Sequence, residues 1–123
     1  MGLDMYANAF TPTADQPATD FPLGELEPNI FYWRKHPNLH GWMQDLYERR
    51  GGSNPDFNCA TVLLTADDID ALEAALDAKA LPHTEGFFFG TSTPEDEADD
   101  RRFIAIAREH IAAGKAIAYH AWW

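Results

Sequence analysis

The sequence predicts a single α+β domain over residues 1–123, with a small, mainly antiparallel sheet packed by about three helices. Three observations predict this fold class. Apolar residues alternate with period two at both ends of the chain, apolar residues in three internal segments recur with the helical spacing, and 123 residues are enough for one domain with its own core. Antiparallel pairing of the two terminal strands would satisfy the backbone at both ends, so both strands are expected in the sheet.

The alternation predicts strands at residues 3–10 and 116–123, and an apolar run predicts another at residues 59–64. The facing sets are Leu3, Met5, Ala7 and Ala9 in the first strand, and Ile117, Tyr119 and Ala121 in the last. A lone cysteine forms neither an internal disulfide nor a zinc site, so Cys59 is expected to be a buried thiol. The glycine-bracketed aromatic segment 86–90 predicts a short further strand whose phenylalanines face both sides.

Capping residues and apolar stripes predict three helices. Their expected limits are Pro37 to Gly51, Thr65 to Lys79 and Thr93 to Gly114. In the third helix, Asp99 and Asp100 lie beside two arginines, and we interpret them as part of a solvated face.

Residues 11–29 predict a long loop, because four prolines exclude both a helix and a central strand. Three apolar side chains within it, Phe21, Leu23 and Leu26, are expected to hold the loop against the rest of the domain.

Composition and charge argue against several classes of function. The net charge of −11 argues against a protein that binds nucleic acid directly, since such a protein needs a basic face, and it favours basic partners. No apolar stretch is long enough for a membrane span, and no secretory signal opens the chain, so a cytoplasmic protein without a membrane partner is expected. No glycine-rich phosphate loop precedes a helix, and no cofactor is expected.

The most suggestive segment covers residues 31–40, where basic and aromatic residues cluster at the start of the first helix. A helix N-terminus offers unpaired N–H groups, and Arg34, Lys35 and His40 add cationic or hydrogen-bonding groups. Trp33 and Tyr32 offer flat faces for a base or a sugar. Together these residues could hold a small anionic, phosphate-bearing ligand. Alternatively, the two cations are a solvated pair and the two aromatic residues belong to the core.

Catalytic and metal-binding patterns are sparse. His36 and His40 are four residues apart, but Pro37 separates loop from helix, so no metal pair is expected. Ser53 and Ser92 lie outside any nucleophile-elbow motif, so no serine–histidine–aspartate triad is predicted. An enzyme that uses His40 as acid or base on a phosphorylated substrate is conceivable, but no second catalytic group accompanies it. Binding is therefore favoured over catalysis.

Three short motifs occur along the chain: MGLDMY at residues 1–6, YWRK at residues 32–35 followed by His40 and Trp42, and LP-x-x-x-GFFFG at residues 81–90. Together they resemble a widespread family of small uncharacterised phage and prophage proteins. The resemblance implies a mobile-element setting in a host cytoplasm and a role in host takeover or counter-defence, but no activity. Some members carry the label phosphoglycerate kinase, which a chain of this length without a nucleotide loop does not support.

The motif positions include Asp4, a carboxylate placed among apolar residues of the first predicted strand. Such a carboxylate must be paired or exposed, and Arg34 or Lys35 is its natural partner.

Three functions follow as hypotheses. The first is a phage accessory protein that binds a small anionic, nucleotide-like ligand. Its expected binding residues are Asp4, Tyr6, Trp33, Arg34, Lys35, His40 and Phe88. The second is an acidic inhibitor that uses the carboxylates of residues 95–100 to imitate DNA against a basic host protein. The third is the small enzyme on a phosphorylated substrate. The aromatic segments 86–90 and 122–123 could also form a homodimer contact.

Overall fold

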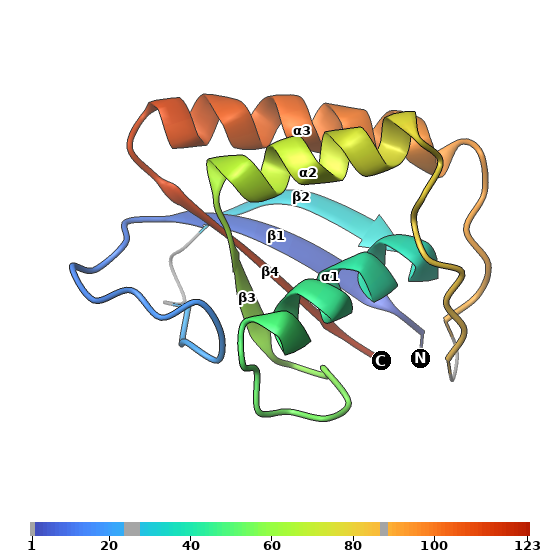
Figure 1. The fold of residues 1–123 in the computed structure, drawn as a ribbon, viewed down its shortest axis with the longest axis horizontal. Coiled ribbons are helices and arrows are strands. Elements are labelled where there is room, and N and C mark those ends of the chain that lie inside the picture. The colour runs from blue at the N-terminus through green and yellow to red at the C-terminus, as the bar shows by residue number, and fades with distance from the viewer. Residues whose placement is uncertain (1, 24–27, 87–88) are drawn as a thin grey trace.

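A computed structural model describes residues 2–23, 28–86 and 89–123 of the chain. Within these residues a four-stranded antiparallel sheet is packed by three helices, which confirms the predicted α+β class (Figure 1). The strands are β1 (Asp4–Phe10), β2 (Asn29–Arg34), β3 (Thr61–Leu64) and β4 (Ala116–Trp122), and the helices are α1 (Pro37–Arg49), α2 (Ala66–Asp77) and α3 (Asp96–Ala112).

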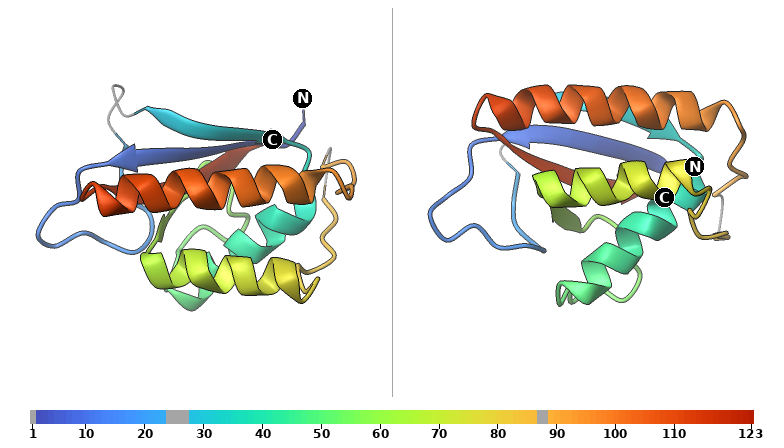
Figure 2. Two further views of the ribbon diagram at one scale, coloured as in Figure 1. Left: turned by 90° about the horizontal axis from the view of Figure 1, so that it is seen from above. Right: turned by 45° about the horizontal axis from the view of Figure 1, so that its top comes forward.

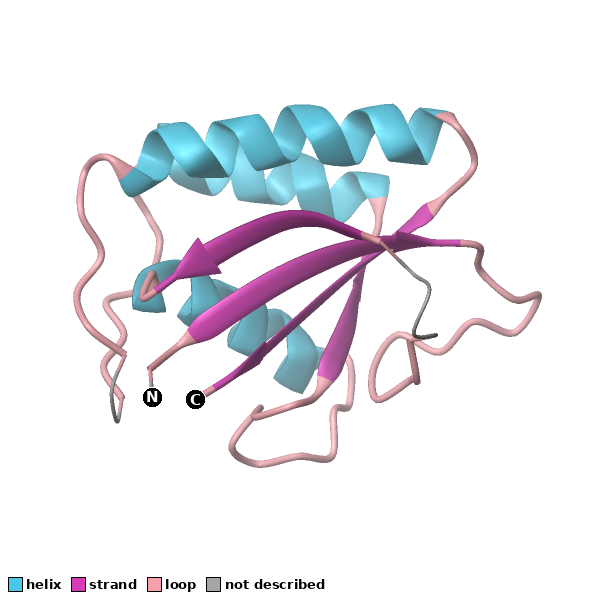
Figure 3. Ribbon diagram, turned by 180° about the vertical axis from the view of Figure 1, so that it is seen from behind, coloured by secondary structure: helices cyan, strands magenta, loops and turns pink. Residues whose placement is uncertain are grey.

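The sheet has the order β2-β1-β4-β3, so the two terminal strands lie side by side at its centre. They pair antiparallel from Asp4↔Trp122 to Phe10↔Ala116, as the sequence predicts. All three helices lie on the same side of the sheet (Figure 2), and the opposite side carries no helix (Figure 3).

The strand β2 was not predicted, and it replaces the strand expected at residues 86–90. Its side chains alternate: Phe31 and Trp33 face the helices, and Tyr32 and Arg34 face away. Gly86, Phe89 and Gly90 lie in no strand, and Phe87 and Phe88 lie outside the described residues. Gly90 has a φ of +75°, which is incompatible with an extended strand.

The helices match the prediction except at the start of α3. Helix α1 begins at Pro37. Helix α2 is capped by Thr65, which accepts from the backbone N–H of Asp68 while the Asp68 carboxylate accepts from the backbone N–H of Thr65. Helix α3 begins at Asp96 rather than at Thr93, because a turn precedes it in which the Asp96 carboxylate accepts from the Thr93 N–H.

The third strand is shorter than expected, and the prediction for its first residue was wrong. Cys59 is exposed and has a φ of +61°, so the extended backbone begins only at Thr61. The backbone N–H of Cys59 still donates to the carbonyl of Ala121, which keeps this segment against the sheet.

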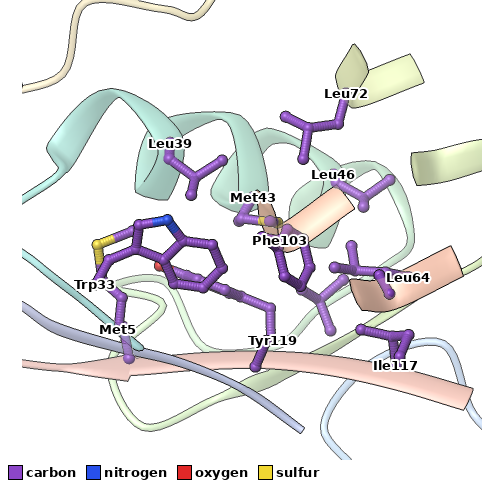
Figure 4. Close-up of a cluster of buried hydrophobic side chains, with 14 of the residues drawn as sticks. Met5, Trp33, Leu39, Met43, Leu46, Leu64, Leu72, Phe103, Ile117 and Tyr119 are labelled. Carbon is purple, nitrogen blue, oxygen red and sulfur yellow. The ribbon is translucent and has the colours of Figure 1, made fainter. Parts of the chain in front are cut away.

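The core lies between the sheet and the helices (Figure 4). Its largest fully buried side chains come from every layer of the fold: Tyr47, Tyr119, Phe57, Phe103, Leu3, Met5, Leu39, Met43, Leu64, Ile69, Leu72 and Ile117. A smaller apolar cluster lies on the other side of the sheet, where Phe21 from the proline-rich loop packs on Phe10 and Ala118. The loop therefore covers one end of the open sheet face, as the sequence predicts for Phe21; Leu26 lies outside the described residues.

Candidate functional site

The register of the sheet assembles a patch of aromatic and charged side chains on the face without helices. In one row, Asp4 lies between Arg34 on β2 and Trp122 on β4. In the next row, Tyr6 lies between Tyr32 and His120. Because side chains two apart on a strand share a face, these six form one surface. We call it the open-face patch: Asp4, Tyr6, Tyr32, Arg34, His120 and Trp122.

Aromatic rings form the middle of the open-face patch. Tyr6 is stacked with His120 at a centroid distance of 5.3 Å and an interplanar angle of 18°. Its ring also lies 5.2 Å from that of Tyr32 and 5.1 Å from that of Trp122. Tyr32 and Trp122 are 49% and 48% exposed, and they are the exposed large hydrophobic side chains among the described residues. Tyr6 thus holds two exposed rings, one on each neighbouring strand.

The charged groups lie at the edge of these rings. The Tyr32 hydroxyl donates to the Asp4 carboxylate at 2.6 Å, and this bond raises the pKa of Tyr32. An Arg34 guanidinium nitrogen lies 4.0 Å from the same carboxylate. The predicted pairing of Asp4 with Arg34 is therefore present, and Tyr32 is a further partner. On the other flank, burial lowers the pKa of His120, so its ring is uncharged at neutral pH.

The structure brings some of the predicted ligand-binding residues together and places others elsewhere. Asp4, Tyr6 and Arg34 meet in the open-face patch with Tyr32, which the sequence also offered as a flat face, and with His120 and Trp122, which were not predicted to bind. Trp33 points the other way and is buried at 3% exposure, so the prediction that it walls a ligand was wrong. Lys35 is exposed but lies in the turn after β2 with a φ of +55°. Phe88 lies outside the described residues.

His40 belongs to the core, and the prediction that it contacts a ligand was also wrong. It is fully buried, and its ring is stacked with Phe57 and lies against Phe89 and Trp123. Its Nδ1 atom lies 2.7 Å from the Tyr119 hydroxyl. Burial lowers the pKa of His40 to about 4. A group without access to solvent cannot act as the acid or base of a solvent-exposed substrate, which removes the assignment made for the small enzyme.

A second group of polar side chains lies on the helix side, where a pocket of about 440 Å³ opens between the starts of α1 and α3 and the C-terminal end of α2. Ser92, His36 and Asp100 line this pocket. The Nδ1 atom of His36 lies 2.7 Å from Ser92 Oγ, and its Nε2 atom lies 2.8 Å from Asp100 Oδ2. The indole N–H of Trp33 donates to Asp100 Oδ1 at 3.1 Å. The backbone N–H of Asn38 donates to Ser92 Oγ at 3.0 Å.

The groups that accept hydrogen bonds determine which atoms of Ser92, His36 and Asp100 carry the hydrogens. An ionised Asp100 only accepts, so Nε2 of His36 carries the hydrogen of that bond. In a neutral ring Nδ1 is then an acceptor, and the Ser92 hydroxyl donates to it at 2.7 Å, while the Asp96 carboxylate lies further from the same nitrogen, at 3.6 Å. Burial raises the pKa of Asp100, while the hydrogen bonds from His36 and Trp33 act in the opposite direction. His36 is 3% exposed and Asp100 fully buried, whereas Ser92 is only partly buried and faces the pocket.

Sequence reasoning missed this group of polar side chains, although one signal was present. The buried face of α3 carries Phe103, Ile104 and Ala107. Asp100 precedes them by three, four and seven residues, and this helical spacing places Asp100 on the same buried face. Its interpretation as part of a solvated face was therefore wrong. Ser92 and His36 are 56 residues apart in the sequence. Their contact depends on the path of the irregular segment that contains Ser92, and no sequence pattern predicts that path.

No known protein family, curated protein or solved structure matches this chain. Among the described residues, no helix is long and apolar enough to cross a membrane. In the same part of the chain, no three histidine, cysteine or acidic side chains gather as metal ligands would.

Proposed function

We propose that the protein binds a small planar ligand with an anionic group, such as a nucleoside monophosphate, on the open-face patch. The observation that carries this proposal is the exposure of Tyr32 and Trp122 on either side of Tyr6. Exposed aromatic faces on a sheet are surfaces on which nucleobases stack, at about 1–3 kcal/mol for each base. Monomeric soluble proteins seldom leave such rings clustered in water without a partner.

Rigidity favours stacking on this surface. The rings of Tyr6 and His120 stack on adjacent central strands, and the Tyr32 hydroxyl is held by Asp4. Two exposed rings whose positions are fixed by sheet register and by a hydrogen bond lose little conformational entropy when a flat ligand covers them.

Charge favours a small anionic ligand over a nucleic acid. Arg34 has a side chain 52% exposed at the edge of the aromatic rings, and Lys35 follows it in the chain. An arginine guanidinium can bond a phosphate group in two places. The net charge of −11, however, opposes a long polyanion. The ligand class is therefore a single nucleotide, in the phage setting that the sequence resemblance implies.

Isothermal titration calorimetry with AMP, GMP, CMP and UMP tests the proposal. At least one nucleotide is expected to bind, and Tyr32→Ala and Trp122→Ala are each expected to weaken that binding by about 10-fold or more, since each removes one stacking face. Tyr32→Phe keeps the ring and removes only the hydroxyl, so it should change the affinity by no more than about threefold.

The charge is tested separately. Arg34→Gln should weaken binding of the nucleotide and leave binding of the corresponding nucleoside unchanged. Arg49→Gln is the matched control, because Arg49 is exposed on α1, away from the sheet. Absence of binding by all four nucleotides, or affinities that Tyr32→Ala and Trp122→Ala leave intact, would contradict the proposal.

The acidic inhibitor receives less support. Of the carboxylates at residues 95–100, Glu97 pairs with Arg101, Asp99 pairs with Arg102, and Asp100 is buried against His36. A DNA mimic needs carboxylates that its basic partner can neutralise, and paired carboxylates offer less of this charge.

A further inference from the structure

We propose that Ser92 and His36 form a nucleophile and general base that hydrolyse small esters in the pocket at the start of α3, with Asp100 as the positioning residue. This activity is separate from the binding proposed for the open-face patch, because the pocket lies on the other side of the sheet.

The geometry has the three features that such a nucleophile needs. A hydroxyl lies 2.7 Å from a ring nitrogen that can accept its proton. The other ring nitrogen is held at 2.8 Å by a buried carboxylate, which fixes the ring and the tautomer. Ser92 also lines a pocket of about 440 Å³, which gives a small substrate room beside it.

The chemical step balances with water as the only co-substrate. Ser92 Oγ attacks the ester carbonyl carbon while its proton passes to Nδ1 of His36. The ester C–O bond then breaks, and the leaving alkoxide takes that proton from His36 and departs as an alcohol. A water molecule attacks the acyl group on Ser92, again giving its proton to Nδ1, and the acid leaves as the proton returns to Ser92 Oγ. The sum is ester plus water to acid plus alcohol.

The pocket walls indicate the class of ester. Leu76, Leu81 and Pro94 give an apolar surface for a short acyl or alkyl group. Asn38 lies beside Ser92, and the backbone N–H of Thr84 holds its Oδ1 at 3.0 Å. Since Oδ1 is occupied, Nδ2 is the group of this side chain left to donate to the negative oxygen of the tetrahedral intermediate.

A fluorophosphonate probe tests whether Ser92 is the nucleophile. Its reaction forms a bond from Ser92 Oγ to phosphorus and releases fluoride and a proton. Peptide mapping by mass spectrometry is expected to find the adduct on Ser92 in the wild-type protein and in Ser53→Ala, and no adduct in Ser92→Ala. Ser53 is the matched control, because its hydroxyl bonds the Asp20 carboxylate and no histidine. No adduct on Ser92, or equally fast labelling of Ser53, overturns the proposal.

Turnover of p-nitrophenyl acetate tests hydrolysis. Ser92→Ala is expected to lower kcat/KM by about 100-fold or more relative to the wild-type protein, and Ser53→Ala to leave it unchanged. A wild-type rate equal to that of Ser92→Ala overturns the proposal.

His36 is tested without removing its side chain, since its loss would leave Asp100 buried without its partner. In Ser92→Cys the introduced thiol replaces the hydroxyl, and the exposed Cys59 is an internal reference. At pH 6 an unassisted thiol is mostly protonated, whereas a thiol beside an imidazole transfers its proton to the ring. The introduced thiol is expected to react with iodoacetamide at least about 10-fold faster than Cys59. Equal or slower reaction overturns the assignment of His36 as base.

The role of Asp100 is tested by pH dependence in Asp100→Asn. The groups that face His36 are Asp96 at 3.6 Å and Asp100, both from α3, while Lys79 and Glu97 line the pocket further out. An asparagine amide donates to Nε2 and moves the ring hydrogen to Nδ1, which can then no longer accept the proton of Ser92. The rate at pH 7 should fall about 100-fold and keep rising above pH 8, as hydroxide replaces the lost base. An unchanged rate and pH profile would overturn the role of Asp100.

Discussion

The indole N–H of Trp33 donates to the Oδ1 atom of Asp100 at 3.1 Å, and this bond joins the edge strand β2 to the second turn of α3. Both side chains are buried. Asp100 also bonds His36 at 2.8 Å, just before α1 begins. One carboxylate therefore connects three elements, and among the described residues these two donors are the hydrogen-bond partners that compensate its burial.

Trp33→Phe is expected to lower the free energy of unfolding by about 2 kcal/mol, because the change leaves a buried carboxylate with one donor fewer. Phenylalanine keeps one aromatic ring against Phe103, which lies 4.9 Å from the Trp33 ring, but it is smaller than the indole, so part of the loss comes from packing. Urea unfolding at pH 7 measures the loss.

The control for this prediction is the same change in the Asp100→Asn background. An amide is less costly than a carboxylate to leave without a donor, so Trp33→Phe should cost at least about 1 kcal/mol less there. Equal losses in the two backgrounds would show that the indole contributes only by packing.

The sequence predicted most of the regular structure for physical reasons that are local. The terminal strands follow from strict alternation, and α2 follows from Thr65 and Asp68, which form a reciprocal cap. The strand β2 was missed because its alternation is short and its residues Tyr32 to Arg34 were interpreted as a ligand site.

The candidate sites were predicted less well, because they depend on tertiary neighbours. The pairing of Asp4 with Arg34 was predicted from charge alone, because a carboxylate among apolar residues needs a partner. The open-face patch residues His120 and Trp122 could be found only once the register of β4 against β1 was known. Ser92 lies in an irregular segment between α2 and α3. No periodic pattern in the sequence predicts that this segment contacts the start of α1.

Stability is expected to fall on acidification because of His40. Burial lowers its pKa to about 4 in the folded chain, whereas an exposed histidine in the unfolded chain titrates near 6.5. Between these two values the unfolded chain binds more protons, so the stability that His40 contributes above about pH 6.5 is lost as the pH falls towards 4. The loss is roughly 3 kcal/mol over the full interval.

Urea unfolding at pH 7 and at pH 4.5 measures this effect, with His40→Gln as the test variant. The variant should show a smaller decrease in stability between the two pH values than the wild-type protein. His83→Gln is the control, since His83 has a side chain 77% exposed and should leave the decrease unchanged. The buried carboxylate of Asp100 acts in the opposite direction, because its raised pKa favours the folded chain at low pH, but it is common to all three proteins. Identical decreases in His40→Gln and the wild-type protein would contradict the prediction.

Gly41→Ala is expected to destabilise the protein by about 1–2 kcal/mol, although alanine is the better helix former by about 1 kcal/mol. Gly41 is buried in α1, and a Cβ added there would overlap the Thr84 hydroxyl. The backbone of Thr84 holds the side chain of Asn38 beside Ser92, so the same displacement would disturb the pocket. In Thr84→Ala the hydroxyl is gone, and Gly41→Ala should become neutral or stabilising. Urea unfolding of the four proteins gives the coupling between the two positions, and a stabilising Gly41→Ala in the wild-type background would show that the segment at Thr84 yields without cost.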